Sequence, residues 1–246
     1  MLCHLGKPLR FRSALRGRSF RRLKVSPRVA MTLGRGFNGR PFCEDGVDYR
    51  ERRGIGMDHD VRLIGYGIRL DPLRIDHAEA LSALTDDGMW AGMTSARPRD
   101  AGEYSAHIAA QVREADALAF AVVDDADGKV LGTTSLYDLS VGQERVEIGS
   151  TWYARDYWGG RTNPAAKWLL LSHSFDTLDV YRVGLRCDAR NARSAAAIQR
   201  LGGVPEAVLR SHRVAADGSR GDTAYFSILR PEWPDVRAGL EARLTS

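Results

Sequence analysis

Residues 145–203 read RVEIGSTWYARDYWGGRTNPAAKWLLLSHSFDTLDVYRVGLRCDARNARSAAAIQRLGG, and this stretch decides the fold. Residues 145–153 alternate in polarity and are rich in β-branched and aromatic side chains, which is typical of a strand. A glycine-containing loop and a helix follow, in which Asn163 can cap the helix and Pro164 suits its first turn. Free backbone N–H groups at such a helix start bind anions, most often a phosphate. A second strand and a second helix complete the stretch.

The flanking sequence predicts one sheet with helices on it. Strands are expected at residues 68–73, 120–123, 130–137, 206–214 and 223–229, and helices at residues 75–84, at 100–117 and from 231 onward. The turn residues at 124–128 join two of these strands antiparallel. This succession favours an α/β (α+β) fold, a single domain with a mixed, mostly antiparallel central sheet flanked by helices.

A basic segment precedes this domain. Residues 1–56 contain 14 Lys and Arg and 4 Asp and Glu, whereas the remaining residues contain 22 and 27. The segment has almost no helical or strand period, so we expect a disordered Arg-rich tail, or a start of translation at Met31 or Met57. A nucleic-acid arm, a targeting peptide and an anchor for an anionic surface are the other interpretations. The domain itself is predicted to span residues 57–246.

Several classes of protein are disfavoured by composition. The cysteines Cys3, Cys43 and Cys187 form no disulfide framework, which fits a reducing cytoplasm. No apolar run approaches the ~18 residues that a membrane span needs, and the histidine spacing is not that of a metal site. We therefore expect a cytoplasmic protein without a membrane contact or a metal ion.

Three motifs in the central stretch resemble the acyl-coenzyme A site of the GNAT family of N-acetyltransferases, and most closely the RimJ/RimL-like branch that acetylates the N-terminal amines of ribosomal proteins. They are Glu147-Ile148-Gly149 with Thr151-Trp152, then Trp158-Gly159-Gly160-Arg161-Thr162-Asn163-Pro164 with Lys167, then Asn191-x-x-Ser194 with Ala197-Ile198 and Leu201-Gly202. The family has a glycine where this chain has Arg161. Either Gly160 makes the tight turn instead, or the loop follows a different path.

The resemblance implies a fold and a reaction. Two neighbouring strands, residues 145–153 and 182–188, would splay apart at the sheet centre. Acetyl-coenzyme A would be the only co-substrate, without a metal, and a primary amine would attack its thioester directly in a ternary complex.

Roles follow for particular residues. Glu147, with the parity of Gly149 and Thr151, can face the cleft and take the proton of the amine directly or through water, although an exposed strand carboxylate is the simpler interpretation. The backbone N–H of Trp152 or Tyr153 could donate to the thioester carbonyl.

The coenzyme would bind on the loop and on the following helix. The predicted phosphate cradle consists of Gly159, Gly160, Arg161, Thr162 and Asn163, with Lys167 one turn into the helix. Asn191 is an N-cap by pattern, and the resemblance adds contact with the pantetheine arm or the thiol region. Ser194 would stabilise or protonate the leaving thiolate. Cys187 is interpreted as a small core residue, since no base is evident beside it.

The sequence leaves several classes of acetyl acceptor open. A protein N-terminal amine is expected, and a small-molecule amine such as a polyamine or an antibiotic is the alternative. A third interpretation is a non-enzymatic protein that binds ribosome or nucleic acid through the basic tail. Residues 75–117 and 206–229, which would build the acceptor pocket, contain no recognisable motif, and oligomeric state is equally open.

Overall fold

A computed structural model describes residues 34–35, 41–42, 59–90, 92–215 and 218–246. Its main sheet has eight strands in the order β3-β4-β5-β6-β7-β8-β10-β9. The strands are β3 (Leu63–Gly65), β4 (Ile68–Pro72), β5 (Leu118–Asp124), β6 (Val130–Ser140), β7 (Arg145–Tyr153), β8 (Arg182–Asp188), β9 (Val204–Val214) and β10 (Arg220–Leu229). All neighbours in this sheet are antiparallel except β7 and β8, which are parallel and are joined by a helical crossover.

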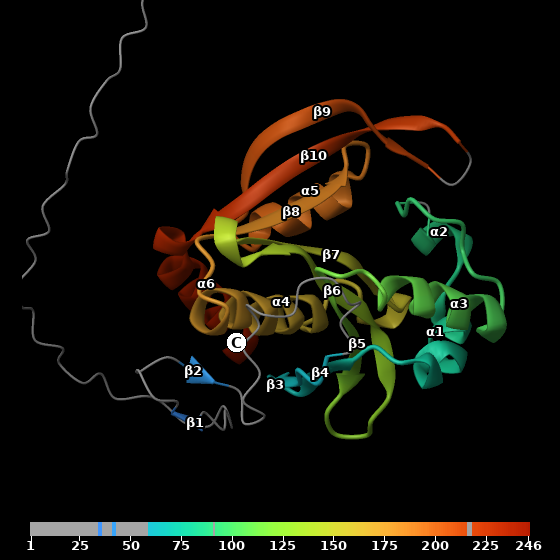
Figure 1. The fold of residues 1–246 in the computed structure, drawn as a ribbon, viewed down its shortest axis with the longest axis horizontal. Helices are drawn as coiled ribbons and strands as arrows, with labels where there is room; N and C mark the ends of the chain where they lie inside the picture. The colour runs from blue at the N-terminus through green and yellow to red at the C-terminus, as the bar shows by residue number, and fades with distance from the viewer. Residues whose placement is uncertain (1–33, 36–40, 43–58, 91, 216–217) are drawn as a thin grey trace, which may run out of the picture.

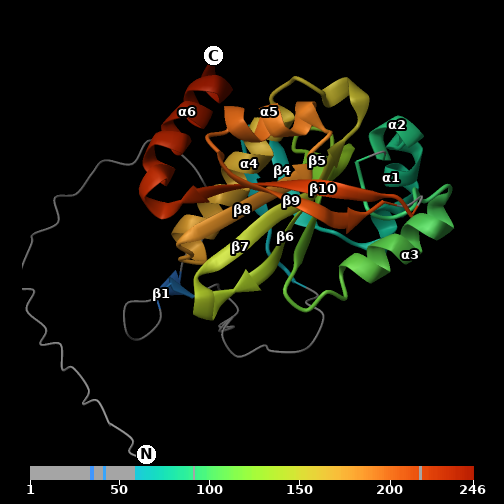
Figure 2. The ribbon, with the colours of Figure 1, turned by 90° about the horizontal axis from the view of Figure 1, so that it is seen from above.

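Helices cover both faces of the sheet (Figures 1 and 2). They are α1 (Ala78–Leu84), α2 (Asp87–Trp90), α3 (Ala101–Gln111), α4 (Thr162–Ser172), α5 (Ala192–Arg200) and α6 (Trp233–Thr245), with short 3-10 or π turns at Ile75–His77, Val141–Gln143, Arg155–Tyr157, His173–Thr177 and Arg230–Glu232. In Figure 1, α1, α2 and α3 lie together at the right, whereas α4 and α6 lie at the left.

Two hydrophobic clusters hold these layers together. The larger packs α4 and α6 on one face of the sheet and includes Val146 and Ile148 of β7. The smaller packs α1, α2 and α3 on the other face and includes Trp152 of β7. Burial of apolar side chains on both faces fixes β7 at the centre of the molecule, with its side chains shared between the two clusters.

The prediction of a single domain with a mixed, mostly antiparallel sheet is confirmed. The Asp100 carboxylate caps α3 by accepting from the Glu103 N–H at 2.8 Å, and the Glu103 carboxylate accepts from the Arg99 N–H at 2.9 Å. The helix ends at Gln111, and its predicted extension to residue 117 is wrong because the apolar period of Tyr104, Ile108 and Val112 gives way to mostly polar residues from 113 to 116.

Most of the predicted tail lies outside the described residues. Within it the structure describes only β1 (Gly34–Arg35) and β2 (Pro41–Phe42), which pair antiparallel apart from the main sheet. The boundary at residue 57 and the disorder of residues 1–56 stay predictions. Across the described part of the chain, no helix is both long and apolar enough to span a bilayer.

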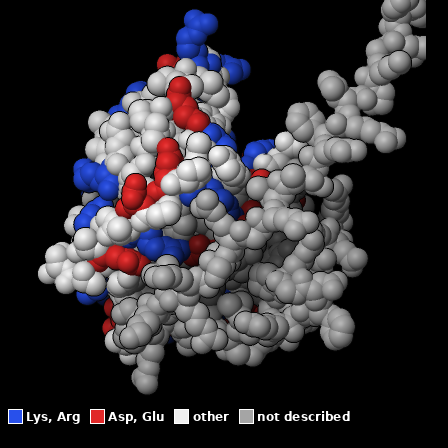
Figure 3. Space-filling view, turned by 90° about the vertical axis from the view of Figure 1, so that its left-hand side faces the viewer, with Lys and Arg blue, Asp and Glu red and all other residues white. Residues whose placement is uncertain are grey.

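Strand β9 forms one edge of the sheet and arches over α5 with β10 (Figure 1). It exposes Val204, Val208 and Leu209, and its ladder with β10 is interrupted where Ser211 adopts a left-handed φ of 50°. On the described part of the face that Figure 3 shows, acidic and basic side chains are interspersed rather than segregated.

Candidate active site

The parallel pair β7 and β8 separates halfway along its length. Pairing runs from Arg145 opposite Arg182 to Ile148 opposite Leu185, and no later pair joins these strands among the described residues. Beyond Ile148 a cavity of about 1090 Å³ opens, lined from β7 by Gly149 and from β8 by Arg186. The predicted splay between residues 145–153 and 182–188 is therefore present in the structure.

A β-bulge lies at the point of separation. Gly149 pairs with Ser135 and Trp152 pairs with Thr133, so that two residues of β7, Ser150 and Thr151, lie opposite one residue of β6. Ser150 takes the extra length in a left-handed conformation with a φ of 46°. Because an inserted residue reverses the alternation of side chains, Thr151 faces α4 while Glu147 faces the other side of the sheet. The prediction that Glu147 and Thr151 share a face is wrong for this reason.

The bulge also orients the backbone N–H groups of β7. The Ala154 N–H donates to the Leu131 carbonyl of β6 at 2.9 Å. Since N–H groups alternate in direction along a strand, the Tyr153 N–H is directed away from β6 and toward the opening. The Tyr153 carbonyl accepts from the Trp158 indole N–H at 2.8 Å on that side. Of the two predicted donors, this geometry favours Tyr153 over Trp152.

The loop before α4 differs from the prediction in two details. Helix α4 begins at Thr162 with Arg161 as its N-cap and no side-chain cap, so Asn163 lies inside the first turn and does not cap the helix. The Arg161 guanidinium donates to the Leu244 carbonyl of α6 at 3.2 Å, and it is not among the groups lining the cavity. The cavity is lined here by Gly159, Gly160, Asn163 and Pro164.

The first turn of α5 lies on the opposite wall. Asn191 is the N-cap, and its side-chain oxygen accepts from the Ser194 N–H at 3.0 Å, as the pattern predicted. Both residues line the cavity. Cys187 lines it too, and burial raises the pKa of its thiol, while a hydrogen bond with Ser194 lowers that pKa in part. A thiol with a raised pKa is a weak nucleophile, in keeping with direct transfer to the amine.

The Trp158 ring contacts two arginines. The Arg193 guanidinium lies 3.7 Å from the centroid of a Trp158 ring, and the Arg155 guanidinium lies 4.8 Å from it. Arg193 follows the Asn191 cap and lines the cavity. Sequence reasoning missed Arg193, although a cation inside the Asn-x-x-Ser motif was a signal that could have identified it.

Lys167 lies deeper in the cavity than the predicted cradle. Its ammonium donates to the Thr151 hydroxyl at 2.7 Å and to the Thr134 hydroxyl at 3.3 Å. The residue is 5% exposed, and burial lowers the pKa of its amine to about 7. The structure thus places Lys167, about one and a half turns into α4, beneath the bulge rather than at the phosphate loop.

Glu147 belongs to a cluster beside the cavity. One of its oxygens lies 3.2 Å from Arg186 Nε, and this nitrogen also donates to the Tyr137 hydroxyl at 3.0 Å. The other end of the guanidinium donates to the Tyr225 hydroxyl at 2.8 Å. Burial and the Glu147 charge raise the pKa of Tyr137, which stays protonated. Tyr137 and Arg186 line the cavity, and Glu147 lies behind them.

An aromatic cluster packs on the α2 and α3 side of the cavity. Trp90 and Tyr104 contact Trp152 with centroid distances of 6.2 and 6.4 Å. His107 packs on Trp90 at 5.5 Å and lines the cavity. Burial lowers the pKa of His107, so its imidazole is neutral at pH 7. His107 is therefore a second group able to accept a proton.

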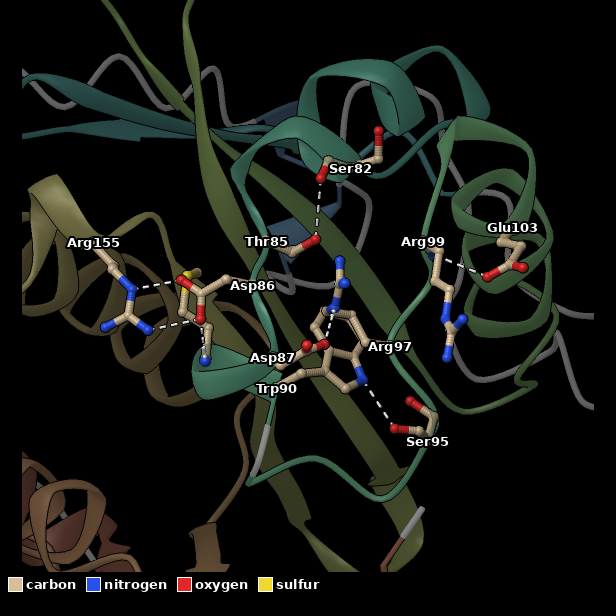
Figure 4. A network of polar contacts seen from close by, with 11 residues as sticks. Ser82, Thr85, Asp86, Asp87, Trp90, Ser95, Arg97, Arg99, Glu103 and Arg155 are labelled. Carbon is tan, nitrogen blue, oxygen red and sulfur yellow. Dashed lines mark hydrogen bonds and ion pairs between the residues drawn. The ribbon is translucent and has the colours of Figure 1, made fainter. Parts of the chain in front are cut away.

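Two contacts hold the α2 segment over this side. The Asp86 carboxylate accepts from both Arg155 Nε and Arg155 Nη2, at 2.5 and 2.7 Å (Figure 4). At the other end, the Arg213 guanidinium of β9 donates to the Gly92 carbonyl at 2.6 Å. A Cβ on Gly92 would lie 3.2 Å from the Asn191 amide nitrogen, so the segment reaches the start of α5.

Comparisons with known proteins agree with this geometry. Residues 68–204 match the family described as Acetyltransferase (GNAT) domain. The Bacillus subtilis (strain 168) protein YdaF, whose name gives it as a proposed ribosomal N-acetyltransferase, is 31% identical over 107 residues. That match covers 44% of this chain and spans 57% of the length of YdaF.

Solved structures share the fold. A GCN5-related N-acetyltransferase from Brucella melitensis is 29% identical with a TM-score of 0.71, covering 76% of this chain and 86% of that one. Mycobacterium smegmatis RimJ in complex with CoA-disulfide is 24% identical with a TM-score of 0.62, covering 72% and 90%. The family match spans more than half of the sequence, and the chain therefore belongs to the GNAT acetyltransferase family.

Proposed function

We propose that the protein is an acetyl-coenzyme A dependent N-acetyltransferase whose acceptor is the N-terminal amine of a protein. The observation that carries this proposal is a single continuous cavity. It is lined by Gly160 in the loop before α4, by Ser194 in the first turn of α5 and by His107 on α3, the proposed acceptor side. Direct transfer requires such a connection, because thioester and amine must be held in contact with each other.

The coenzyme fits the chemistry of one half of this cavity. Its diphosphate would accept from backbone N–H groups of residues 160–163 at the start of α4, with Gly159 in a left-handed turn at a φ of 74°. Neither Gly159 nor Gly160 has a neighbour within 3.4 Å of where a Cβ would be, which leaves room for a ligand. Arg193 would add charge at this end, and Asn191 would contact the pantetheine arm.

The reaction forms a C–N bond and breaks the C–S bond. The Tyr153 N–H would donate to the thioester carbonyl oxygen as negative charge develops there. Glu147 would take the proton of the amine through water, from behind Tyr137 and Arg186, and His107 is the competing acceptor. Ser194 would hydrogen-bond the departing thiolate, which leaves as the coenzyme thiol once protonated.

Two observations support a protein acceptor over a small amine. The acceptor side is long: it runs from Gln111 at the end of α3 and Glu114 just after it to His212 and Thr223 on the β9–β10 hairpin, a length suited to an extended peptide. In addition, the name of the relative YdaF refers to ribosomal N-acetylation. The specific protein is left to experiment.

The test is a measurement of coenzyme release with the full chain and acetyl-coenzyme A. The acceptors are peptides that differ in their first residue, N-terminally blocked copies of the same peptides, and small amines including a polyamine. We expect turnover with free-amine peptides and none with the blocked copies. Turnover confined to small amines would contradict the protein acceptor, and no release with any amine would contradict the enzymatic function.

Replacing Ser194 by alanine is expected to lower turnover about tenfold or more without a comparable loss of coenzyme affinity. The reason is that a hydrogen bond to a charged group contributes about 1.5–3 kcal/mol, and the charge on sulfur exists only as the bond breaks. Steady-state kinetics with varied acetyl-coenzyme A give kcat and KM separately. The control is Asn191→Ala, which should also lower the melting temperature because it removes the cap of α5. Unchanged kcat in Ser194→Ala would remove Ser194 from the reaction.

A further inference from the structure

The environment of Lys167 contains polar groups but no balancing charge. Its ammonium contacts the Thr151 and Thr134 hydroxyls, which lie 2.8 Å from each other. Among the described residues no carboxylate is paired with it, and burial alone accounts for the lowered pKa of its amine. The surrounding positions of α4, including Ala166 and Leu170, are buried and apolar.

A buried ammonium without an anion is costly for the folded protein. Taking the charge out of water costs several kcal/mol, and neutral hydroxyls return only part of this. A leucine or methionine would fill the same space in α4 without that cost. The protein itself supplies no anion to balance the Lys167 ammonium. A substrate that develops negative charge in the cavity would supply one.

The position of Lys167 identifies where such an anion would come from. Its side chain lines the cavity directly under the bulge, and its hydrogen-bond partner Thr151 lies two residues before Tyr153. Negative charge develops in the proposed reaction on the thioester carbonyl oxygen and then on the sulfur. Both atoms would lie at this end of the cavity, between Tyr153 and Ser194.

We propose that Lys167 supplies the positive charge that stabilises the thioester end of the coenzyme as it becomes negative, acting from the α4 face beneath the bulge. This inference rests on the proposed function. Lys167 acts in its ammonium form, which negative charge nearby favours, and it forms no covalent bond. It acts partly through its hydrogen bond to the Thr151 hydroxyl, which fixes the position of β7, the strand that also carries the Tyr153 N–H. Preorganised charge at this place needs no rearrangement during the reaction.

The decisive variant is Lys167→Met, which keeps an unbranched side chain one atom shorter than lysine and removes the charge. We expect kcat to fall about 100-fold, as for loss of an oxyanion donor, with KM for acetyl-coenzyme A changed less than about threefold. We also expect a melting temperature at least about 3 °C higher, since the uncompensated charge is gone. Lys129→Met is the control, because Lys129 is exposed at the β5–β6 turn and should leave both quantities unchanged.

The kcat and the melting temperature of Lys167→Met together distinguish a charge that serves the reaction from a side chain that only stabilises the fold. A melting temperature that falls in Lys167→Met, or a variant that does not fold, would overturn the proposal and make Lys167 a support of the bulge. A kcat of Lys167→Met within about threefold of the parent value would also overturn the proposal. The proposed function is tested separately, by whether the parent protein turns over at all.

A second readout is independent of turnover. The thiol of bound coenzyme A is titrated by the absorbance of its thiolate in the parent protein and in Lys167→Met. An ammonium nearby favours the thiolate, so the midpoint in the parent should lie about one pH unit or more below that in the variant. Equal midpoints would overturn the proposal, and this holds even if no acceptor amine has been identified.

Discussion

Gly132→Ala is expected to destabilise the protein by about 3 kcal/mol or more and to abolish turnover. A Cβ at this position would lie 2.1 Å from the Trp152 carbonyl oxygen and 2.8 Å from the Tyr153 Cα, and the Gly132 φ is 158°. Backbone atoms of β7 cannot move aside as a flexible side chain can. The strand that carries the Tyr153 N–H would have to shift, so stability and activity are lost together.

Thermal unfolding of Gly132→Ala should show a fall in melting temperature of about 6 °C or more. Gly142→Ala is the matched control, because no atom lies within 4 Å of its added Cβ and its φ is not in the left-handed region. Parent-like activity in Gly132→Ala would mean that the position of β7 is not critical for the reaction. It would then exclude the Tyr153 N–H as the carbonyl donor.

Glu147→Gln is expected to lower kcat about 100-fold or more at pH 7, the usual effect of losing a general base. An N-terminal amine has a pKa of about 7.7–8.0, so only about a tenth of it is neutral at pH 7. Raising the pH to about 9 supplies neutral amine and should restore part of the rate. The variant keeps the shape of the side chain and should fold normally, although Arg186 loses the partner that lies 3.2 Å away.

A pH–rate profile of parent and variant checks this expectation. Glu79→Gln, an exposed position on α1, is the control for a carboxylate outside the site. His107→Gln tests the competing group, which lines the cavity with a neutral imidazole. If Glu147→Gln keeps the parent rate across the pH range while His107→Gln loses it, then His107 takes the proton and Glu147 serves to hold Arg186.

Local patterns in the sequence predicted much of this site. Alternating polarity gave β7 its exact limits of Arg145 and Tyr153, and Asn-x-x-Ser predicted the cap at Asn191, because both depend on near neighbours in the chain. The bulge was not predictable, since a serine such as Ser150 also occurs in regular strands and gives no sign of an inserted residue. One inserted residue reversed the face of Thr151.

Long-range contacts explain the remaining differences. Arg161 is directed to the Leu244 carbonyl, a residue 83 positions away, which no pattern in the loop could indicate. Lys167 was expected at the phosphates because it lies in the motif, one turn into the helix that follows the glycine loop. Its place within the apolar run of α4 was a signal that the side chain points inward, toward the Thr151 and Thr134 hydroxyls.

The irregular backbone of the edge strand β9 limits the pairing of this sheet with a strand from another molecule. Its backbone could serve as a template for a strand from another chain, which is a route to aggregation. Pro205 has no N–H to offer near one end, and the left-handed Ser211, whose N–H is taken by the Asp222 carboxylate at 2.8 Å, breaks the row near the other. Only a short stretch between them remains regular enough to pair. The enzyme can thus expose valine and leucine on this strand while its solubility is protected by the backbone itself.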